Sequence, residues 1–262
     1  GDSYALTAEQ IQSFHKNGYA TLPGFLTEEE VMELEQVFDL FVEGKIDVPG
    51  KDFCDMSQPF GIPFEKWQLV NAMLPREYYP DWKGNIFEQL CDKAAKQLFP
   101  NINMTLDYDQ LLMKRPQQKE AVFAWHQDLA YWPQDTPDNY TVTFSLAINT
   151  ANQENGCLRV IPGSHKEESL RIHRPLSGSR DEGHALTVDL LDSDEQVYLP
   201  VNRGDVTIHE ERIVHGSPGN VSKVPRKTYV IAFRSVATVE HERSIGFTHS
   251  HNTEQNWDTF IS

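Results

Sequence analysis

The order of helical and strand patterns along the chain predicts a mainly β domain with flanking helices, an α-decorated sandwich or barrel such as a jelly roll. Residues 1–103 carry mostly helical patterns. From about residue 104 onwards, short segments rich in β-branched and aromatic residues recur between clusters of Gly, Pro, Asn and Asp. In residues 140–148, polar and apolar side chains alternate with the period of two that is typical of a strand with one buried face.

Three helices are predicted in the first part of the chain. A capping-box pattern begins at Thr7, and Gly18 supplies the stop of that helix. The same pattern begins at Thr27, and apolar residues then recur on one helical stripe until Gly44. Residues 85–98 have the composition of a third helix.

We expect one domain, 1–262, with the β core in 104–240 and a C-terminal tail in 241–262. The polar stretch 166–196 is long for a connection inside a compact domain, which indicates a lid or binding loop. The predicted strands are residues 104–113, 121–126, 140–149, 157–161, 197–201, 204–209 and 228–236.

Composition narrows the class of protein. Hydrophobic residues make up 39% and aromatic residues 11% of the chain, as in a folded globular protein. No apolar run approaches the ~20 residues of a membrane helix. The formal net charge of −16 disfavours binding to nucleic acid or to an anionic membrane surface, so we expect a small-molecule partner.

The cysteines indicate a reducing compartment. Cys54, Cys91 and Cys157 are scattered and odd in number, which argues against a disulfide framework. No charged-then-apolar secretion signal opens the sequence. We therefore expect a cytoplasmic protein.

The segment 123–133, Phe-Ala-Trp-His-Gln-Asp-Leu-Ala-Tyr-Trp-Pro, places a histidine and an aspartate among four large aromatic residues. In a strand, His126 and Asp128 point to the same side, where they must be paired, bound to a metal or exposed to water. A single metal can accept both. A third ligand from elsewhere would complete the 2-His-1-carboxylate arrangement of non-haem Fe(II) oxygenases.

A second group of polar residues lies nearer the C-terminus. A Gly-Asp turn leads into a predicted strand, and a loop then brings His215 beside Ser217. Eleven residues beyond His215, Arg226 stands at the start of the next strand, where a guanidinium can hold a carboxylate bidentately. This context favours His126-x-Asp128 over two segments of the same spacing, His165-Lys-Glu167 and His209-Glu-Glu211.

Each of these residues also has a purely structural alternative. His209 is either a ligand in place of His215 or a hydrogen-bonded core residue. In the structural alternative, Ser217 caps a turn and Arg226 forms a surface ion pair. The aromatic residues around His126 are core residues in the same alternative.

Several separated motifs occur in the order and spacing of one known family. They are His126-Gln-Asp128, Asn155-Gly-Cys-Leu-Arg-Val-Ile-Pro-Gly-Ser-His165, His215-Gly-Ser217 and Arg226, preceded by a similar opening segment at 14–25. The chain thereby resembles the phytanoyl-CoA dioxygenase family over most of its length, and least over residues 45–100. The resemblance implies a double-stranded β-helix, a cupin-like jelly roll. It also implies an Fe(II)- and 2-oxoglutarate-dependent dioxygenase that uses O₂.

The resemblance further implies roles for single residues. His126, Asp128 and His215 would bind Fe(II), and Arg226 would grip the 5-carboxylate of 2-oxoglutarate beside Ser217. The similar ectoine hydroxylases also carry Phe-x-Trp-His-x-Asp, although their signature is not continued beyond the second tryptophan, so ectoine itself is not implied. By this likeness, the expected walls of the co-substrate pocket are Phe123 and Trp132, with Gln110 and Lys114 on the preceding strand.

The expected reaction is oxidation of a C–H bond. Related halogenases replace the carboxylate ligand by a small residue, so the presence of Asp128 favours hydroxylation, or a desaturation or ring closure, over halogenation. The alternatives are a non-redox, metal-dependent cupin-like enzyme, such as an isomerase or hydrolase, and a catalytically silent binding protein of the same fold. The first would not need Arg226, and the second would be expected to have lost a ligand.

Two sets of residues bear on the substrate. A CoA phosphate site is not expected, because the chain is acidic and has no basic run. A small anion, such as a phosphonate or carboxylate, suits the cationic set Lys166, Arg171, His173, Arg174, Arg180 and His184. An ammonium group suits the carboxylates and aromatic rings of 52–57, Tyr78, Tyr79, Trp82, Tyr131 and Trp132. Together they suggest a small zwitterionic amine, amino-acid-like or phosphonate metabolite.

Overall fold

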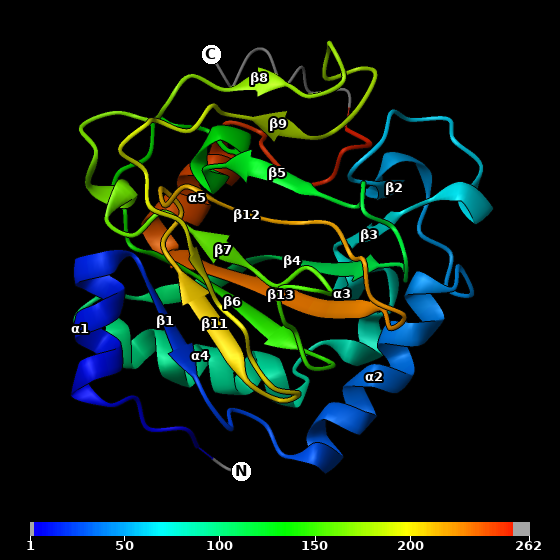
Figure 1. The fold of residues 1–262 in the computed structure, drawn as a ribbon. Helices are drawn as coiled ribbons and strands as arrows, with labels where there is room; N and C mark the ends of the chain where they lie inside the picture. Colours follow the sequence, from blue (N-terminus) through cyan, green and yellow to red (C-terminus); the bar gives the residue numbers. More distant parts are fainter. Residues whose placement is uncertain (1–2, 254–262) are drawn as a thin grey trace.

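The computed structural model describes residues 3–253, which form two facing antiparallel sheets with helices on the outside (Figure 1). The larger sheet has seven strands in the order β1-β11-β6-β13-β4-β3-β2, and the smaller has four in the order β10-β7-β12-β5. A two-stranded ribbon, β8-β9, lies at one end. This arrangement confirms the jelly roll predicted from the sequence.

The elements have the following bounds. The larger sheet contains β1 (Tyr19–Leu22), β2 (Phe53–Asp55), β3 (Leu69–Met73), β4 (Met104–Lys114), β6 (Thr141–Ala147), β11 (Val206–His209) and β13 (Arg226–Ser235). The smaller sheet contains β5 (Phe123–His126), β7 (Arg159–Val160), β10 (Val197–Tyr198) and β12 (His215–Ser217), and the ribbon contains β8 (Arg174–Pro175) and β9 (Leu186–Thr187). The α-helices are α1 (Ala8–Asn17), α2 (Glu28–Val42), α3 (Pro75–Tyr78), α4 (Ile86–Leu98) and α5 (Val236–Ser244). Short 3₁₀ turns are η1 (Gly50–Asp52), η2 (Phe64–Lys66), η3 (Pro80–Trp82), η4 (Asp128–Tyr131) and η5 (Ser164–Lys166).

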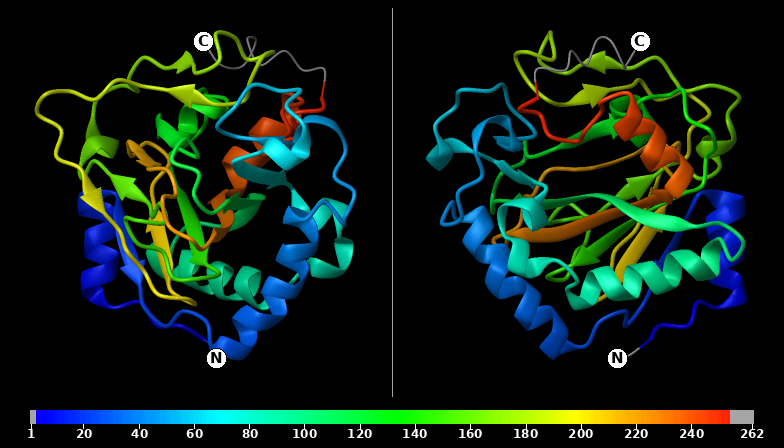
Figure 2. Two further views of the ribbon diagram at one scale, coloured as in Figure 1. Left: turned by 45° about the vertical axis from the view of Figure 1, so that its right-hand side comes forward. Right: turned by 180° about the vertical axis from the view of Figure 1, so that it is seen from behind.

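The main apolar core lies between the larger sheet and the helices α2 and α4, which cover its outer face (Figure 2). Phe38 of α2 and Phe87 of α4 are fully buried there with Phe144 of β6. Burial of each such side chain contributes about 1.5–3 kcal/mol. The alternation predicted for β6 is present, because its neighbours Thr143 and Ser145 face the other way, into a cavity between the sheets. The outer face of the larger sheet is therefore packed in the core, and its inner face lines a cavity that can form a site.

The helices predicted from the sequence are present with their caps. The Thr7 hydroxyl accepts from the Gln10 N–H, and Gly18 ends α1 with a φ of 87°, in the left-handed region. Thr27 caps α2 in the same way, and Asn85 caps α4. None of the helices in residues 3–253 combines the length and the apolar character needed to cross a membrane.

The structure differs from the sequence-based expectation at both ends of the chain. The first 103 residues, expected to be mostly helical, also contain β1, β2 and β3, which extend the larger sheet on both sides. β3 is buried along its whole length and therefore lacks the alternation that identifies a strand. The expected C-terminal tail is part of the fold as far as residue 253: Phe247, His249 and His251 are buried. The rest of that tail lies outside the described residues.

Candidate metal centre and its two cavities

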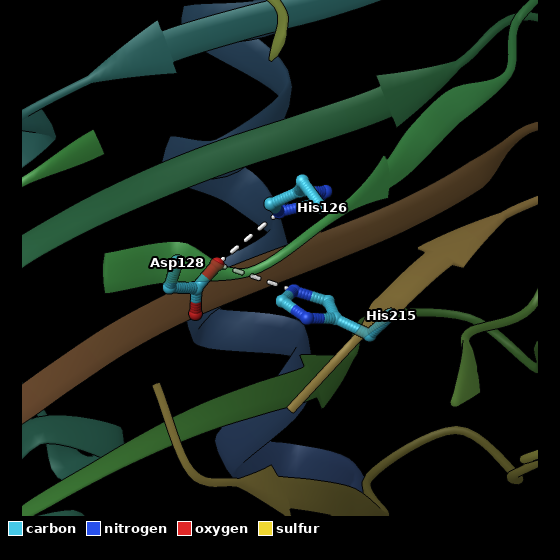
Figure 3. Close-up of side chains that lie close together, drawn as sticks. All are labelled: His126, Asp128 and His215. Carbon is cyan, nitrogen blue, oxygen red and sulfur yellow. Dashed lines mark hydrogen bonds and ion pairs between the residues drawn. The ribbon is translucent and has the colours of Figure 1, made fainter. Parts of the chain in front are cut away.

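The imidazole of His126 and the carboxylate of Asp128 converge between the two sheets with the imidazole of His215, which comes from a distant part of the sequence (Figure 3). His126 ends β5, His215 begins β12, and these two residues are direct partners across the strand pair. The Asp128 Oδ1 atom lies 3.2 Å from the Nε2 atom of His126 and 3.2 Å from the Nε2 atom of His215. All three side chains are buried, and one ligand atom from each lies within 4.8 Å of the others. This geometry suits a single metal ion.

The local backbone fixes which ring nitrogens face the centre. The Nδ1 atom of His126 donates to the Ala124 carbonyl oxygen at 2.7 Å, and the Nδ1 atom of His215 donates to the Ile213 carbonyl oxygen at 2.9 Å. A proton held at Nδ1 leaves the Nε2 lone pair for a metal. Both imidazoles are thus set in the tautomer that a metal ligand requires.

The predicted strand 121–126 ends at His126, as β5 does, but the argument that His126 and Asp128 share one face of a strand was wrong. The strand β5 ends at His126, and Asp128 begins the turn η4. Gln127 anchors the change of direction, because its amide donates to the Arg212 carbonyl and accepts from the Arg171 N–H. The two ligands still face one another, although the cause is the turn and not the alternation of a strand.

His209 holds the second oxygen of the same carboxylate. Its Nε2 atom lies 2.8 Å from Asp128 Oδ2, while Oδ1 faces His126 and His215. Burial opposes ionisation of Asp128, but attraction to His215 and His209 outweighs it and holds the pKa of this carboxyl well below its usual value. Of the two alternatives for His209, the geometry favours the hydrogen-bonded one. The competing His165 lies elsewhere, with its ring against the His15 carbonyl.

A buried guanidinium without a counter-charge lies in the cavity next to this centre. Arg226, the first residue of β13, is only 7% exposed, and burial lowers its pKa to about 10. Within the part of the chain that the structure describes, no residue forms an ion pair or hydrogen bond with its guanidinium, and its Nε atom is buried without a partner. The alternative of a surface ion pair is therefore wrong. Because an unpaired buried cation is costly, this guanidinium is suited to binding an anionic ligand.

We name the space around it the Arg226 cavity. Its space of about 470 Å³ includes the part that is open to solvent. Of the predicted site residues, it is lined by His126, Asp128, His215, Ser217, Phe123 and Gln110, together with Arg226.

Two predicted wall residues lie outside the Arg226 cavity. Lys114 is Arg226's partner across β4 and β13, but it is not among the lining residues. Its ammonium donates to the Pro218 carbonyl oxygen and lies against Gly156. Trp132 lines a different space, because η4 carries the chain past the centre before this ring is reached. The guanidinium of Arg234 lies 4.7 Å from its ring centroid.

That different space is a second cavity of about 410 Å³, which we name the imidazole cavity. It shares Tyr108, Gln110, Phe123, His126 and Asp128 with the Arg226 cavity, so the two meet at the metal centre. Its other walls are Met56, Met73, Tyr131, Trp132, His184, His249 and His251.

Sequence reasoning missed the contribution of the C-terminal segment to this cavity. The run Thr-His-Ser-His, residues 248–251, sets two histidines two positions apart, and this spacing was an available signal. Asp52 holds the segment in place by accepting from the Ser250 hydroxyl and the His251 N–H.

A second cluster with metal-like spacing is a salt-bridge network. Asp107, Glu242 and His249 offer ligand atoms within 4.8 Å of one another. Arg243 lies 2.6 Å from Asp107, and Arg234 pairs with Glu242. The guanidinium groups already satisfy the carboxylates, so a further cation is not needed here. The network fixes His249, whose Nε2 atom donates to Asp107 at 2.8 Å.

A 2-His-1-carboxylate centre that opens onto a cavity with a buried, unpaired arginine defines an Fe(II)- and 2-oxoglutarate-dependent dioxygenase. The family model of phytanoyl-CoA dioxygenase (PhyH) matches residues 14–228, and the chain belongs to this family.

Known relatives agree with this class. The chain is 24% identical over 245 residues to peroxisomal phytanoyl-CoA dioxygenase of Mus musculus, covering 89% of this chain and 70% of the relative. It is 27% identical over 233 residues to a probable alpha-ketoglutarate-dependent hypophosphite dioxygenase of Stutzerimonas stutzeri, covering 86% and 78%. The crystal structure of EvdO2 from Micromonospora carbonacea var. aurantiaca complexed with 2-oxoglutarate superposes with a TM-score of 0.70. That match has 25% identity and covers 89% of this chain and 92% of EvdO2.

Proposed function

We propose that this dioxygenase hydroxylates a C–H bond of a small polar metabolite, with His126, Asp128 and His215 as the iron ligands and Arg226 as the anchor of 2-oxoglutarate. The observation that carries the proposal is the buried, unpaired guanidinium of Arg226 in the cavity that also contains the ligand set. A non-redox metal enzyme has no need for such a cation. The complete ligand set argues in the same way against a catalytically silent binding protein.

The residues present fit iron and 2-oxoglutarate. Two neutral imidazoles and one carboxylate are a donor set that Fe(II) accepts. When bound, Fe(II) and 2-oxoglutarate supply the oxidising power, consuming O₂ and yielding succinate and CO₂. The protein positions the metal, the co-substrate and the substrate, and it limits the access of water to them.

Each residue of the chain has a defined task in this proposal. The Nδ1–H groups of His126 and His215 donate to backbone carbonyl oxygens, so both Nε2 atoms would be available to hold the metal. Arg226 binds the distal carboxylate of the co-substrate through paired N–H donors. Ser217 and Phe123 line the same cavity, where Ser217 offers a hydroxyl and the ring of Phe123 excludes water.

A polar substrate is supported by the walls of the imidazole cavity, which meets the ligand set at His126 and Asp128 and is lined by further imidazole, amide and phenol groups. The name of the Stutzerimonas stutzeri relative identifies hypophosphite, a small oxyanion, as its substrate. This likeness supports a small polar substrate over a long acyl-CoA. Asp128 occupies the position that a coordinated halide would need, which supports hydroxylation, or a desaturation or ring closure, over halogenation.

Arg226→Ala tests the proposal. We expect the 2-oxoglutarate concentration needed for half-maximal succinate release to rise by about two orders of magnitude, because a charged contact with a buried partner is lost. Lys227→Gln is the matched control, since Lys227 is the adjacent cation and pairs with Glu35 and Asp39 instead. An unchanged requirement in Arg226→Ala would remove this residue from the site.

A further inference from the structure

Gln127, the residue between the first two metal ligands, is held on three sides. Its side-chain amide donates to the Arg212 carbonyl oxygen at 2.6 Å and accepts from the Arg171 N–H at 2.8 Å. Its backbone N–H donates to the Nε2 atom of His173 at 2.9 Å. Two of these three contacts come from the polar loop 166–196, which the sequence indicated as a lid or binding loop.

The half-buried imidazole of His173 is set to accept this hydrogen bond. Its Nδ1 atom donates to the Arg171 carbonyl oxygen at 2.7 Å, so the proton is held at Nδ1 and the Nε2 atom keeps its lone pair. Burial, with a smaller contribution from His126 and His215, lowers the pKa of His173 to about 4, so the ring is neutral at neutral pH. A neutral ring in this tautomer accepts from a backbone N–H as a carbonyl oxygen does.

The polar loop is itself anchored next to His173. The Arg171 guanidinium lies 2.6 Å from Glu167 and 2.6 Å from Asp194, and only 9% of the Arg171 side chain is exposed. A guanidinium held by two carboxylates has little freedom to move. The backbone of Arg171 therefore presents its N–H to Gln127 and its carbonyl oxygen to His173 from a fixed position.

A later part of the polar loop also holds the segment that carries the ligands. The Val188 N–H donates to the Trp125 carbonyl oxygen at 2.9 Å, and the Leu186 N–H donates to the Tyr131 hydroxyl at 2.7 Å. The loop thus contacts the ligand segment before, between and after the two ligands. Among these contacts, only the one made by His173 uses a side chain of the loop, so it can be removed by substitution.

We infer that His173 is a positioning residue of the metal centre: it fixes the backbone between His126 and Asp128, so that the Asp128 carboxylate stays opposite the ligand imidazoles. This inference rests on the proposed function, which makes those residues iron ligands. His209 and His173 act at different points, since His209 holds the carboxylate of Asp128 and His173 holds the backbone one residue earlier. Arg171 and His173 were expected in a cationic set for a substrate anion, and these contacts give them a different task.

Two polar variants of His173 test the inference without turnover, in competition with a fluorescent chelator for Co(II). His173→Asn keeps an amide near the Nδ1 position but lacks an acceptor at the Nε2 position, so the affinity for Co(II) should fall about tenfold, as for other groups that orient a ligand. His173→Gln places its amide oxygen near the Nε2 position, where it can accept from the Gln127 N–H, and should retain most of the affinity. His165→Asn is the matched control, since that imidazole bonds to the His15 carbonyl oxygen, away from the metal centre.

The visible absorption spectrum of bound Co(II) reports the geometry of the ligands, which a loss of loop stability alone would not change. We expect a changed spectrum in His173→Asn and a wild-type spectrum in His173→Gln and His165→Asn. In succinate release, His173→Asn should lower the maximal rate and leave the 2-oxoglutarate requirement unchanged, because His173 does not line the Arg226 cavity. Wild-type affinity and spectrum in His173→Asn, or equal losses in the Asn and Gln variants, would refute the inference. Absence of Co(II) binding by the wild type would instead refute the ligand assignment on which the proposed function depends.

Discussion

His209→Phe provides the sharpest test of how the metal centre is held. His209 Nε2 and Asp128 Oδ2 are 2.8 Å apart, and the two side chains are only 4% and 9% exposed. A hydrogen bond to a charged group contributes about 1.5–3 kcal/mol, and each 1.4 kcal/mol is about a factor of ten in an equilibrium constant. We therefore expect the affinity for Co(II) or Fe(II) to fall about 10- to 100-fold, the usual effect of losing a group that orients a ligand.

Competition with a fluorescent chelator measures this affinity directly, without turnover. His209→Gln should retain most of the affinity, because its amide N–H can replace the Nε2 donor. His165→Phe is the matched control, since it removes another buried imidazole that bonds only to the His15 carbonyl. If His209→Phe bound metal as tightly as the wild type, the carboxylate would not depend on His209 for its orientation.

Three further predictions follow from the site and its surroundings. His126→Ala and Asp128→Ala should each abolish iron-dependent succinate formation while the thermal unfolding temperature stays close to that of the wild type; wild-type turnover in either would refute the ligand assignment. Burial raises the pKa of Asp109 to about 7, although Arg76 opposes the rise. The folded protein then binds more protons than the unfolded chain between about pH 4 and about pH 7, so this group lowers stability as pH rises through that window, and urea unfolding of Asp109→Asn should show a weaker decline. Gly156→Ala should lower the unfolding temperature, because Gly156 has a φ of 91° and a Cβ there would lie 2.6 Å from the Pro218 carbonyl oxygen; an unchanged temperature would contradict this reading.

The sequence was sufficient for the elements with a regular period and a cap. The helices that begin after Thr7 and Thr27 were predicted almost to the residue, because their capping side chains are local signals, and the helix that begins after Asn85 was predicted from the composition of 85–98. The jelly roll followed from the many short segments after residue 104. The strand β3 was missed since it is buried along its whole length and so has no alternation.

The ligand set was predicted better than its surroundings. His126, Asp128 and His215 converge as expected, although Asp128 does so from a turn. Lys114 and Trp132 were expected to line the co-substrate pocket and lie outside the Arg226 cavity. For Lys114, position on a strand does not determine which space a long side chain reaches, and for Trp132 the turn η4 redirects the chain. The walls formed by residues 184, 249 and 251 depend on contacts between distant parts of the chain, and no local pattern encodes such contacts.

The pairing of Asp52 with His251 joins residues 199 positions apart. Every metal ligand lies between these two residues. The 2-His-1-carboxylate set is therefore synthesised before His251, which forms part of the wall of the imidazole cavity. A chain that ends before His249 and His251 would therefore keep all three ligands, while the space beside them would be open to water. Cutting the protein after residue 246 should leave a molecule that binds metal but consumes 2-oxoglutarate without coupling it to substrate oxidation.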